Sequence, residues 1–160
     1  MSSPYIDALK MLGRRELSEL QIRQRLVRKG HAEDEIDDAV RRLKDERALD
    51  DRRVAGAIAR TEVVIKRRGR SRVLRQIEQA GIPASVARDA VAEVFGDVDD
   101  EALMQAALGK RLRGDRPIAD RREFERLFRY LTAQGFDSTR ILKALNARRG
   151  PSTSSPDEVD

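Results

Sequence analysis

The sequence lacks the residues that most catalytic and metal sites need. It contains no cysteine and no tryptophan, and His31 is its single histidine. Disulfides, thiolate chemistry, common zinc sites and histidine-based triads are therefore not expected, and His31, which follows a glycine, is predicted to be solvated. No GxxxxGK[ST] or GxGxxG motif occurs, so nucleotide binding has no support. The sequence predicts no catalytic residue, no metal and no cofactor, and hence not an enzyme.

Aromatic residues and long apolar runs are also scarce. Aromatics make up 4% of the chain, too few for a ladder that stacks single-stranded bases. We expect Phe124 and Phe128, four positions apart, in the core, and Tyr130 and Phe136 partly exposed. No apolar run approaches the roughly 18 residues of a membrane span, and the first residues do not resemble a secretory signal. A cytoplasmic location without a membrane partner is expected.

What the chain has in abundance is charge and good helix formers. Charged residues are 38% and hydrophobic residues 39% of the sequence, which leaves little apolar surface for one large core. Ala, Leu, Arg, Glu and Gln dominate, and all favour helices. The composition indicates an all-α protein with several small, locally packed cores.

A repeat gives this helical chain its organisation. Three segments place an aliphatic residue four positions before a glycine and another aliphatic five or six positions after it: Leu26–Gly30 with Ile36, Ile77–Gly81 with Val86, and Leu131–Gly135 with Ile141. Similarity at a period of about 50 residues is typical of stacked supersecondary units, which build long binding surfaces. The predicted fold is therefore tandem three-helix repeats forming an elongated, curved array.

The boundaries of these repeats follow from helix start and stop signals. Ser18 with Gln21 is a capping-box pattern, and the three glycines suit left-handed helix stops. We expect helices over 4–14, from Ser18 to Gly30, over 33–46 and from Asp50, then over 71–79, 83–95 and from Asp99, and finally from Asp120 and around Ile141. The predicted segments are an N-terminal helix (1–15), repeat one (16–68), repeat two (69–114), a partial repeat three of two helices (117–149) and a disordered tail (150–160).

Basic clusters near the repeat junctions are the candidate functional surface. The formal net charge is +5 and the sequence pI about 9.9. A basic edge would suit a phosphate backbone or a polymeric partner, whereas cations at helix C-termini also complement the helix dipole, and both explanations stay open. Two helices around a glycine turn resemble a helix-turn-helix, but the second helices carry acids and alanines, so sequence-specific duplex readout is not expected.

Four stretches resemble the RecX family in order and spacing. Residues 14–30 are similar to the first-repeat segment of that family, and Leu49–Ala55 (LDDRRVA) to its L-D-D-x-x-aromatic-A stretch. Residues 69–81 resemble the second-repeat segment, and 130–136 with Ile141 and Leu145 the third. The similarity extends over about residues 5–149.

The resemblance implies a monomeric bacterial regulator of the RecA recombinase that binds the groove of the RecA filament on single-stranded DNA. Inhibition of ATP hydrolysis, strand exchange and filament extension is implied with it, and direct contact with DNA phosphates is left open. The contact surface is predicted to comprise Arg23, Lys66, Arg67, Arg68, Arg70, Arg72, Arg75, Lys110, Arg111 and Arg113. A free-standing, non-specific nucleic-acid-binding protein is the alternative, and a helical protein scaffold a weaker one.

Overall fold

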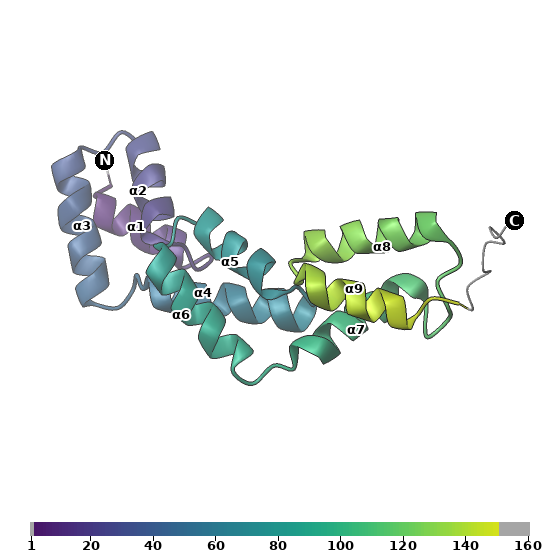
Figure 1. Cartoon of the computed structure of the whole chain (residues 1–160). Helices are drawn as coiled ribbons and strands as arrows, with labels where there is room; N and C mark the ends of the chain where they lie inside the picture. The colour runs from purple at the N-terminus through teal and green to yellow at the C-terminus, as the bar shows by residue number, and fades with distance from the viewer. Residues whose placement is uncertain (1, 151–160) are drawn as a thin grey trace, which may run out of the picture. The chain divides into compact units, whose positions relative to one another are not determined.

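The computed structural model describes residues 2–150, and in this range the chain is all-α, as predicted (Figure 1). No β-strand occurs among these residues, although an isolated bridge pairs Ile118 with Arg149. The helices are α1 (Pro4–Leu12), α2 (Glu19–Arg28), α3 (Glu33–Asp45), α4 (Asp51–Arg60), the π-helix η1 (Thr61–Ile65), α5 (Arg70–Gln79), α6 (Ala84–Phe95), α7 (Asp100–Leu112), α8 (Arg121–Gln134) and α9 (Ser138–Ala147). Apart from Gly150, the predicted disordered tail lies outside the described residues.

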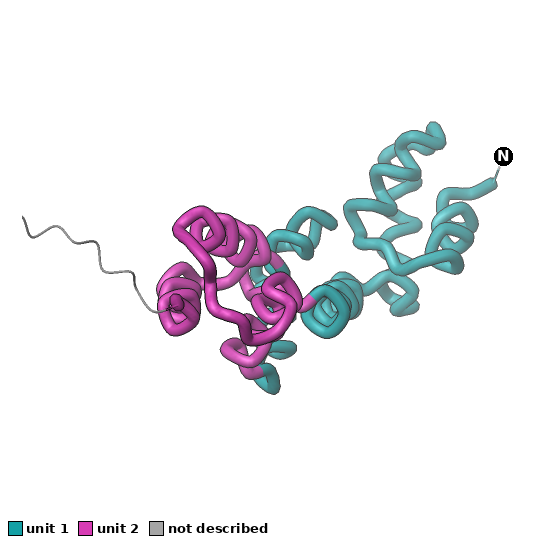
Figure 2. The backbone as a smooth tube through the Cα atoms, turned by 90° about the vertical axis from the view of Figure 1, so that its right-hand side faces the viewer, with its two compact units in different colours: residues 1–66, 73–98 teal, residues 67–72, 99–160 magenta. Residues whose placement is uncertain are grey.

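The helices belong to two compact units, coloured separately in Figure 2. Unit 1 comprises residues 1–66 and 73–98, and unit 2 comprises residues 67–72 and 99–160. The short 67–72 segment therefore belongs to unit 2, although the chain on both sides of it belongs to unit 1. None of the described helices is long and apolar enough to cross a membrane.

The first three helices of unit 1 share one core. Leu17, Ile22, Leu26, Ile36 and Leu43 are its largest fully buried side chains, and Ala8 of α1 is buried with them. Since α1 packs on α2 and α3, the three-helix packing begins one helix before the repeat predicted from the glycines. The boundaries predicted for the repeats, 16–68, 69–114 and 117–149, describe the periodicity of the sequence and stay a prediction.

In the second half of unit 1, α4 packs on α6 and continues into η1. The prediction that Val64 or Ile65 faces the core is wrong, since both side chains are 73% exposed. Glu62 and Val63 are buried instead, and Val63 lies four positions after the buried Ala59 and eight after the buried Ala55, on the same helix face. The buried Glu62 carboxylate lies 2.8 Å from Lys66 Nζ.

Unit 2 has its own three-helix core. Met104, Leu108 and Leu112 of α7 pack with Leu127 and Leu131 of α8 and with the buried face of α9. Helix α7 thus completes the packing of the two-helix partial repeat predicted at 117–149. The four aromatic side chains of α8 and the α8–α9 turn (Phe124, Phe128, Tyr130 and Phe136) are all partly buried against this core, so Phe124 and Phe128 are less enclosed than predicted.

The helix ends use the signals read from the sequence. Ser18 and Gln21 form the predicted capping box at the start of α2. Gly30, Gly81 and Gly135 have φ values of +89°, +82° and +99°, which confirms them as left-handed helix stops. Asp50 caps α4, as its position indicated, whereas Asp51 accepts a hydrogen bond from the Glu19 amide at the start of α2 (2.9 Å).

The prediction that His31 is solvated is wrong, because its side chain is only 10% exposed. His31 Nε2 lies 2.7 Å from Asp7 Oδ2 on α1, and Lys29 Nζ lies 3.3 Å from Asp7 Oδ1. The hydrogen bond with His31 lowers the pKa of Asp7 below its ordinary value of 3.8. A carboxylate and an imidazole that are 24 residues apart therefore tie α1 to the loop between α2 and α3.

This pairing predicts an acid-sensitive contribution to the stability of unit 1. Because the pKa of Asp7 is lowered on folding, its contribution is present above about pH 3.8 and is lost as the pH falls through the lower folded value. We expect Asp7→Asn to lower the thermal unfolding midpoint at pH 7, and the difference from the wild type to shrink as the pH falls below about 3.8. Asp38→Asn, which removes only an exposed pair with Arg41, should change little over the same pH range. An equal effect of the two substitutions at pH 7 would contradict the role of Asp7.

Candidate protein and DNA interface

The net positive charge of the described residues lies in unit 2. Its described residues, 67–72 and 99–150, contain 16 Lys and Arg residues against eight Asp and Glu residues. The residues of unit 1, 1–66 and 73–98, contain 17 of each sign and have no net formal charge. A partner with a phosphate backbone would therefore be attracted mainly by unit 2.

Within unit 2, the basic 67–72 segment lies against the C-terminal end of α8. The Gly69 amide donates to the Gln134 carbonyl (2.8 Å), and the Ser71 amide and hydroxyl donate to the Gly135 carbonyl (3.3 and 3.0 Å). Carbonyls at the end of a helix have no partner inside the helix, and these hydrogen bonds supply one. They place four arginines beside the negative end of the α8 dipole.

Two glycines make this close approach of backbones feasible. A Cβ atom on Gly69 would lie 2.5 Å from the Gly135 carbonyl oxygen, and one on Gly135 would lie 2.4 Å from the Arg72 amide nitrogen. Gly135 also has a left-handed backbone, which costs other L-residues about 1–2 kcal/mol. Gly135 therefore ends α8 and also accommodates the 67–72 segment.

Four of the ten predicted contact residues form salt bridges or hydrogen bonds within their own unit. Arg23 pairs with Glu19 and Asp37, and the hydrogen bond with Asp37 raises its pKa. Lys66 pairs with the buried Glu62, and Arg70 with Asp100. Arg72 donates to the Ala133 carbonyl (3.0 Å), which fits the helix-terminus explanation better than a contact role.

The other six predicted contact residues differ in their exposure to solvent and in their contacts with the rest of the protein. Arg67, Lys110 and Arg113 are exposed, and Arg67 and Arg113 have left-handed backbones that turn them out of the helices. The Arg111 guanidinium lies over the Tyr130 ring, 4.7 Å from its centroid. Arg68 is half-buried and has an interaction partner, and Arg75, which belongs to unit 1, is exposed on α5. The structure therefore groups Arg67, Arg68, Arg70 and Arg72 in one segment, and Lys110, Arg111 and Arg113 at the end of α7.

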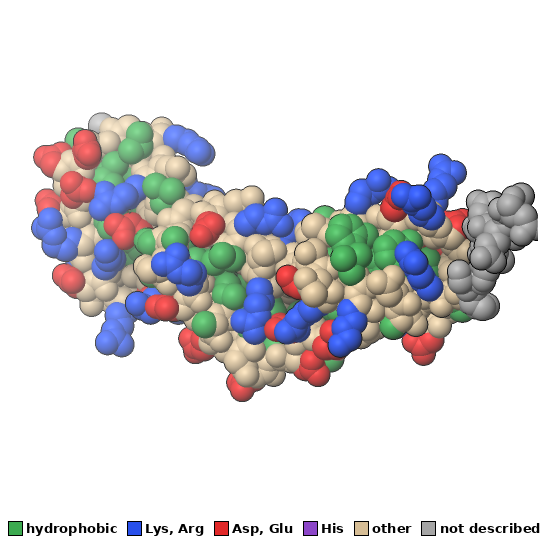
Figure 3. Space-filling model, in the orientation of Figure 1, with side chains coloured by type: hydrophobic (Ala, Val, Ile, Leu, Met, Phe, Trp, Pro, Cys, Tyr) green, Lys and Arg blue, Asp and Glu red, His purple; other side chains and the backbone are tan. Residues whose placement is uncertain are grey.

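A basic face of α8 adds to these groups. Arg122, Arg126 and Arg129 are exposed at helical spacing, and none of them forms a salt bridge to another residue in the 2–150 range. Figure 3 shows Lys and Arg side chains gathered over α8. The i, i+4, i+7 spacing was visible in the sequence, but only the fold shows that these side chains share the unit that holds the excess charge.

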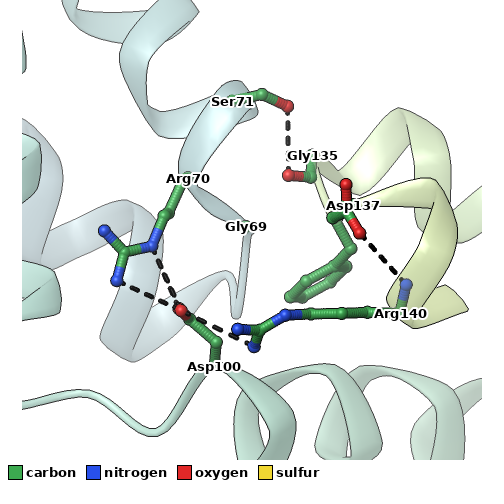
Figure 4. A pocket seen from close by; sticks show the side chains of 8 residues that line it. Gly69, Arg70, Ser71, Asp100, Gly135, Asp137 and Arg140 are labelled. Carbon is green, nitrogen blue, oxygen red and sulfur yellow. Dashed lines mark hydrogen bonds and ion pairs between the residues drawn. The ribbon is translucent and has the colours of Figure 1, made fainter. Parts of the chain in front are cut away.

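A pocket of about 380 Å³ lies beside the 67–72 segment, entirely within unit 2 (Figure 4). Arg70 and Arg140 both point at Asp100 Oδ2, with the nearest guanidinium nitrogens at 3.1 and 3.7 Å. The remaining lining residues are Gly69, Ser71, Gly135, Phe136 and Asp137. Arg140 and Asp100 were absent from the predicted surface because only the tertiary fold brings them to Arg70. No group of three or more His, Cys, Asp and Glu residues suited to a metal occurs within the described part of the chain.

The glycine contact predicts a position-specific loss of stability. Gly135→Ala should lower the free energy of unfolding by about 2–4 kcal/mol, because backbone strain and overpacking against Arg72 add together. Gly114→Ala in the same unit has a similar φ of +105° but nothing within 4 Å of its Cβ, so about 1–2 kcal/mol is expected. Urea unfolding followed by circular dichroism compares the two variants. Equal losses would contradict a tight fit between Gly135 and the 67–72 segment.

Comparisons with known proteins identify the family. Residues 5–43 match the family model described as RecX, first three-helix domain. The chain is 31% identical over 145 residues to the regulatory protein RecX of Chromohalobacter salexigens, covering 90% of this chain and 91% of that protein. It is 32% identical over 150 residues to the regulatory protein RecX of Halorhodospira halophila, covering 90% of each.

Solved structures of RecX proteins show the same fold. The crystal structure of RecX from Lactobacillus salivarius matches with a TM-score of 0.73 at 20% identity, covering 90% of this chain and 95% of that one. A second crystal structure of regulatory protein RecX gives the same TM-score at 22% identity, covering 90% and 70%. The length and identity of the sequence matches show that this chain belongs to the RecX family of regulatory proteins.

Proposed function

We propose that this chain regulates RecA-dependent recombination and DNA repair in the cytoplasm of its bacterium. It binds the groove of the RecA filament on single-stranded DNA and inhibits ATP hydrolysis, strand exchange and filament extension. It acts by binding and carries no catalytic activity of its own. Membership of a family of regulatory proteins supports the regulatory role, and the charge distribution supports a nucleoprotein partner.

The excess of eight positive charges in the described part of unit 2 is the observation that carries this proposal. A RecA filament on DNA presents both phosphates and protein surface. Each of the two units has a surface that suits one of these. Unit 2 offers the α8 face and the basic residues Arg67, Lys110 and Arg113 for contact with acidic groups. Unit 1 has no net charge and exposes Val27, Val64 and Ile65, which suit contact with protein.

A free-standing nucleic-acid-binding protein is the second candidate, and the same excess of charge favours it. It predicts tight DNA binding without RecA and a steep salt dependence, since each neutralised phosphate adds about 0.9 to the log–log slope on duplex DNA and about 0.7 on single strands. The difference from the first proposal is whether RecA is needed for the effect.

The proposal is tested by adding this protein in increasing amounts to an assay of RecA ATP hydrolysis on single-stranded DNA. We expect inhibition at concentrations well below that of RecA, because a regulator of filament extension acts on a polymer. No change in ATP hydrolysis, together with tight salt-sensitive DNA binding in the absence of RecA, would contradict the proposal and favour the second candidate.

The α8 face gives a residue-level version of this test. Arg122→Glu, Arg126→Glu and Arg129→Glu together should weaken inhibition at least tenfold, because three attractive contacts become repulsive. The matched control replaces Arg14, Arg15 and Arg88, three exposed arginines of unit 1, by glutamate and changes the net charge equally. Equal losses in the two folded variants would show that only overall charge matters and would contradict an interface on α8.

A further inference from the structure

The pocket between Arg70 and Arg140 has a feature that salt bridges on a protein surface usually lack. Two guanidinium groups from separate segments converge on one carboxylate oxygen, Asp100 Oδ2, and an open volume of about 380 Å³ adjoins them. Two cationic forks around one oxygen, with room beside it, match the way arginines hold a phosphate. The oxygen now held between them belongs to the protein itself.

We propose that this pocket binds a phosphodiester of single-stranded nucleic acid between Arg70 and Arg140, and that Asp100 is an internal anion which the phosphate displaces. The inference deepens the proposed function by placing the DNA strand on unit 2. Asp100 stands in for the ligand while the protein is free, and thereby keeps both guanidiniums paired and in position.

Replacing the Asp100 carboxylate by a phosphate between Arg70 and Arg140 should cost little free energy. The side chains of Arg70 and Arg140 are 52% and 51% exposed, and that of Asp100 is 22% exposed, so solvent screens both ion pairs from the arginine side. Solvent-exposed ion pairs each change a binding constant by about fivefold or less. Asp99 caps α7 through its own hydrogen bonds to the Glu101 and Ala102 amides, so the start of that helix does not depend on Asp100. Asp100 can therefore leave the arginines without unfolding α7.

The remaining walls of the pocket favour a nucleic-acid strand over an acidic peptide. The half-buried Phe136 lines the pocket next to the arginines, and an aromatic ring beside a phosphate site provides a face on which a base can stack. The described part of the surrounding unit carries eight excess positive charges, which attract a polyanion regardless of its sequence. An isolated carboxylate of a partner protein would leave the ring unused, and its single charge would be attracted less strongly by the long-range field than a polyanion.

Removal of the internal anion should strengthen DNA binding rather than weaken it. We expect Asp100→Asn to bind fluorescein-labelled oligo(dT) about threefold to tenfold more tightly than the wild type, measured by anisotropy without RecA. Asp115→Asn is the matched control, because it removes an exposed carboxylate of the same unit that does not line the pocket. Its effect should stay below about twofold, since exposed charges farther away are screened by salt.

A second pair of variants makes the test independent of how Asp100→Asn folds. Arg140→Gln should weaken oligo(dT) binding and reduce the log–log salt slope by about 0.7, the contribution of one single-strand phosphate. Lys143→Gln removes a cation from the same helix but outside the pocket and should leave the slope close to that of the wild type. In the Arg140→Gln background, Asp100→Asn should lose most of its effect.

Three outcomes would overturn the inference. The first is an Asp100→Asn affinity equal to or below that of Asp115→Asn in folded proteins. The second is an unchanged salt slope in Arg140→Gln. The third is tighter binding of a poly-glutamate peptide, but not of oligo(dT), by Asp100→Asn, which would assign the pocket to an acidic protein partner. Because RecA is absent from these measurements, they can fail while inhibition of the RecA ATPase holds, and the reverse is also possible.

Discussion

The end of α8 determines the arrangement of the basic residues in unit 2. Its last carbonyls accept hydrogen bonds from Gly69, Ser71 and Arg72, and the two backbones fit only because Gly69 and Gly135 have no side chains. Through these contacts a segment of six residues is attached to a unit that otherwise begins at residue 99. The position of Arg70 opposite Arg140, and with it the pocket, follows from this attachment.

This attachment also separates structural arginines from those available to a partner. Arg72 is used at the end of α8, and Lys66 and Arg23 are paired with acidic side chains of unit 1. Arg111 lies over the Tyr130 ring, whereas no salt bridge with another residue of the described range is formed by Arg122, Arg126 and Arg129 on α8 or by Lys110 and Arg113 at the end of α7. Part of the excess of basic residues therefore belongs to helix-end chemistry, and the remaining exposed residues form the proposed binding surface.

The sequence predicted the helices, the capping box and the glycine stops, because these depend on neighbours within four or five positions. It did not predict the π-turn at Thr61–Ile65, since no local residue pattern distinguished this turn from a continued α-helix. His31 and Asp7, like Arg140 and Asp100, are brought together by tertiary packing, which local patterns do not encode. The family resemblance, by contrast, came from motif order along the whole chain and was confirmed by the matches to RecX proteins.

Unit 2 is the part of the chain that we propose meets the nucleoprotein filament through its basic surface. Amide hydrogen exchange of this protein, free and bound to RecA filaments on single-stranded DNA, tests it most directly. We expect slower exchange in the 67–72 segment and in α8 on binding. Protection confined to α1–α3, with α8 and the 67–72 segment unchanged, would contradict it.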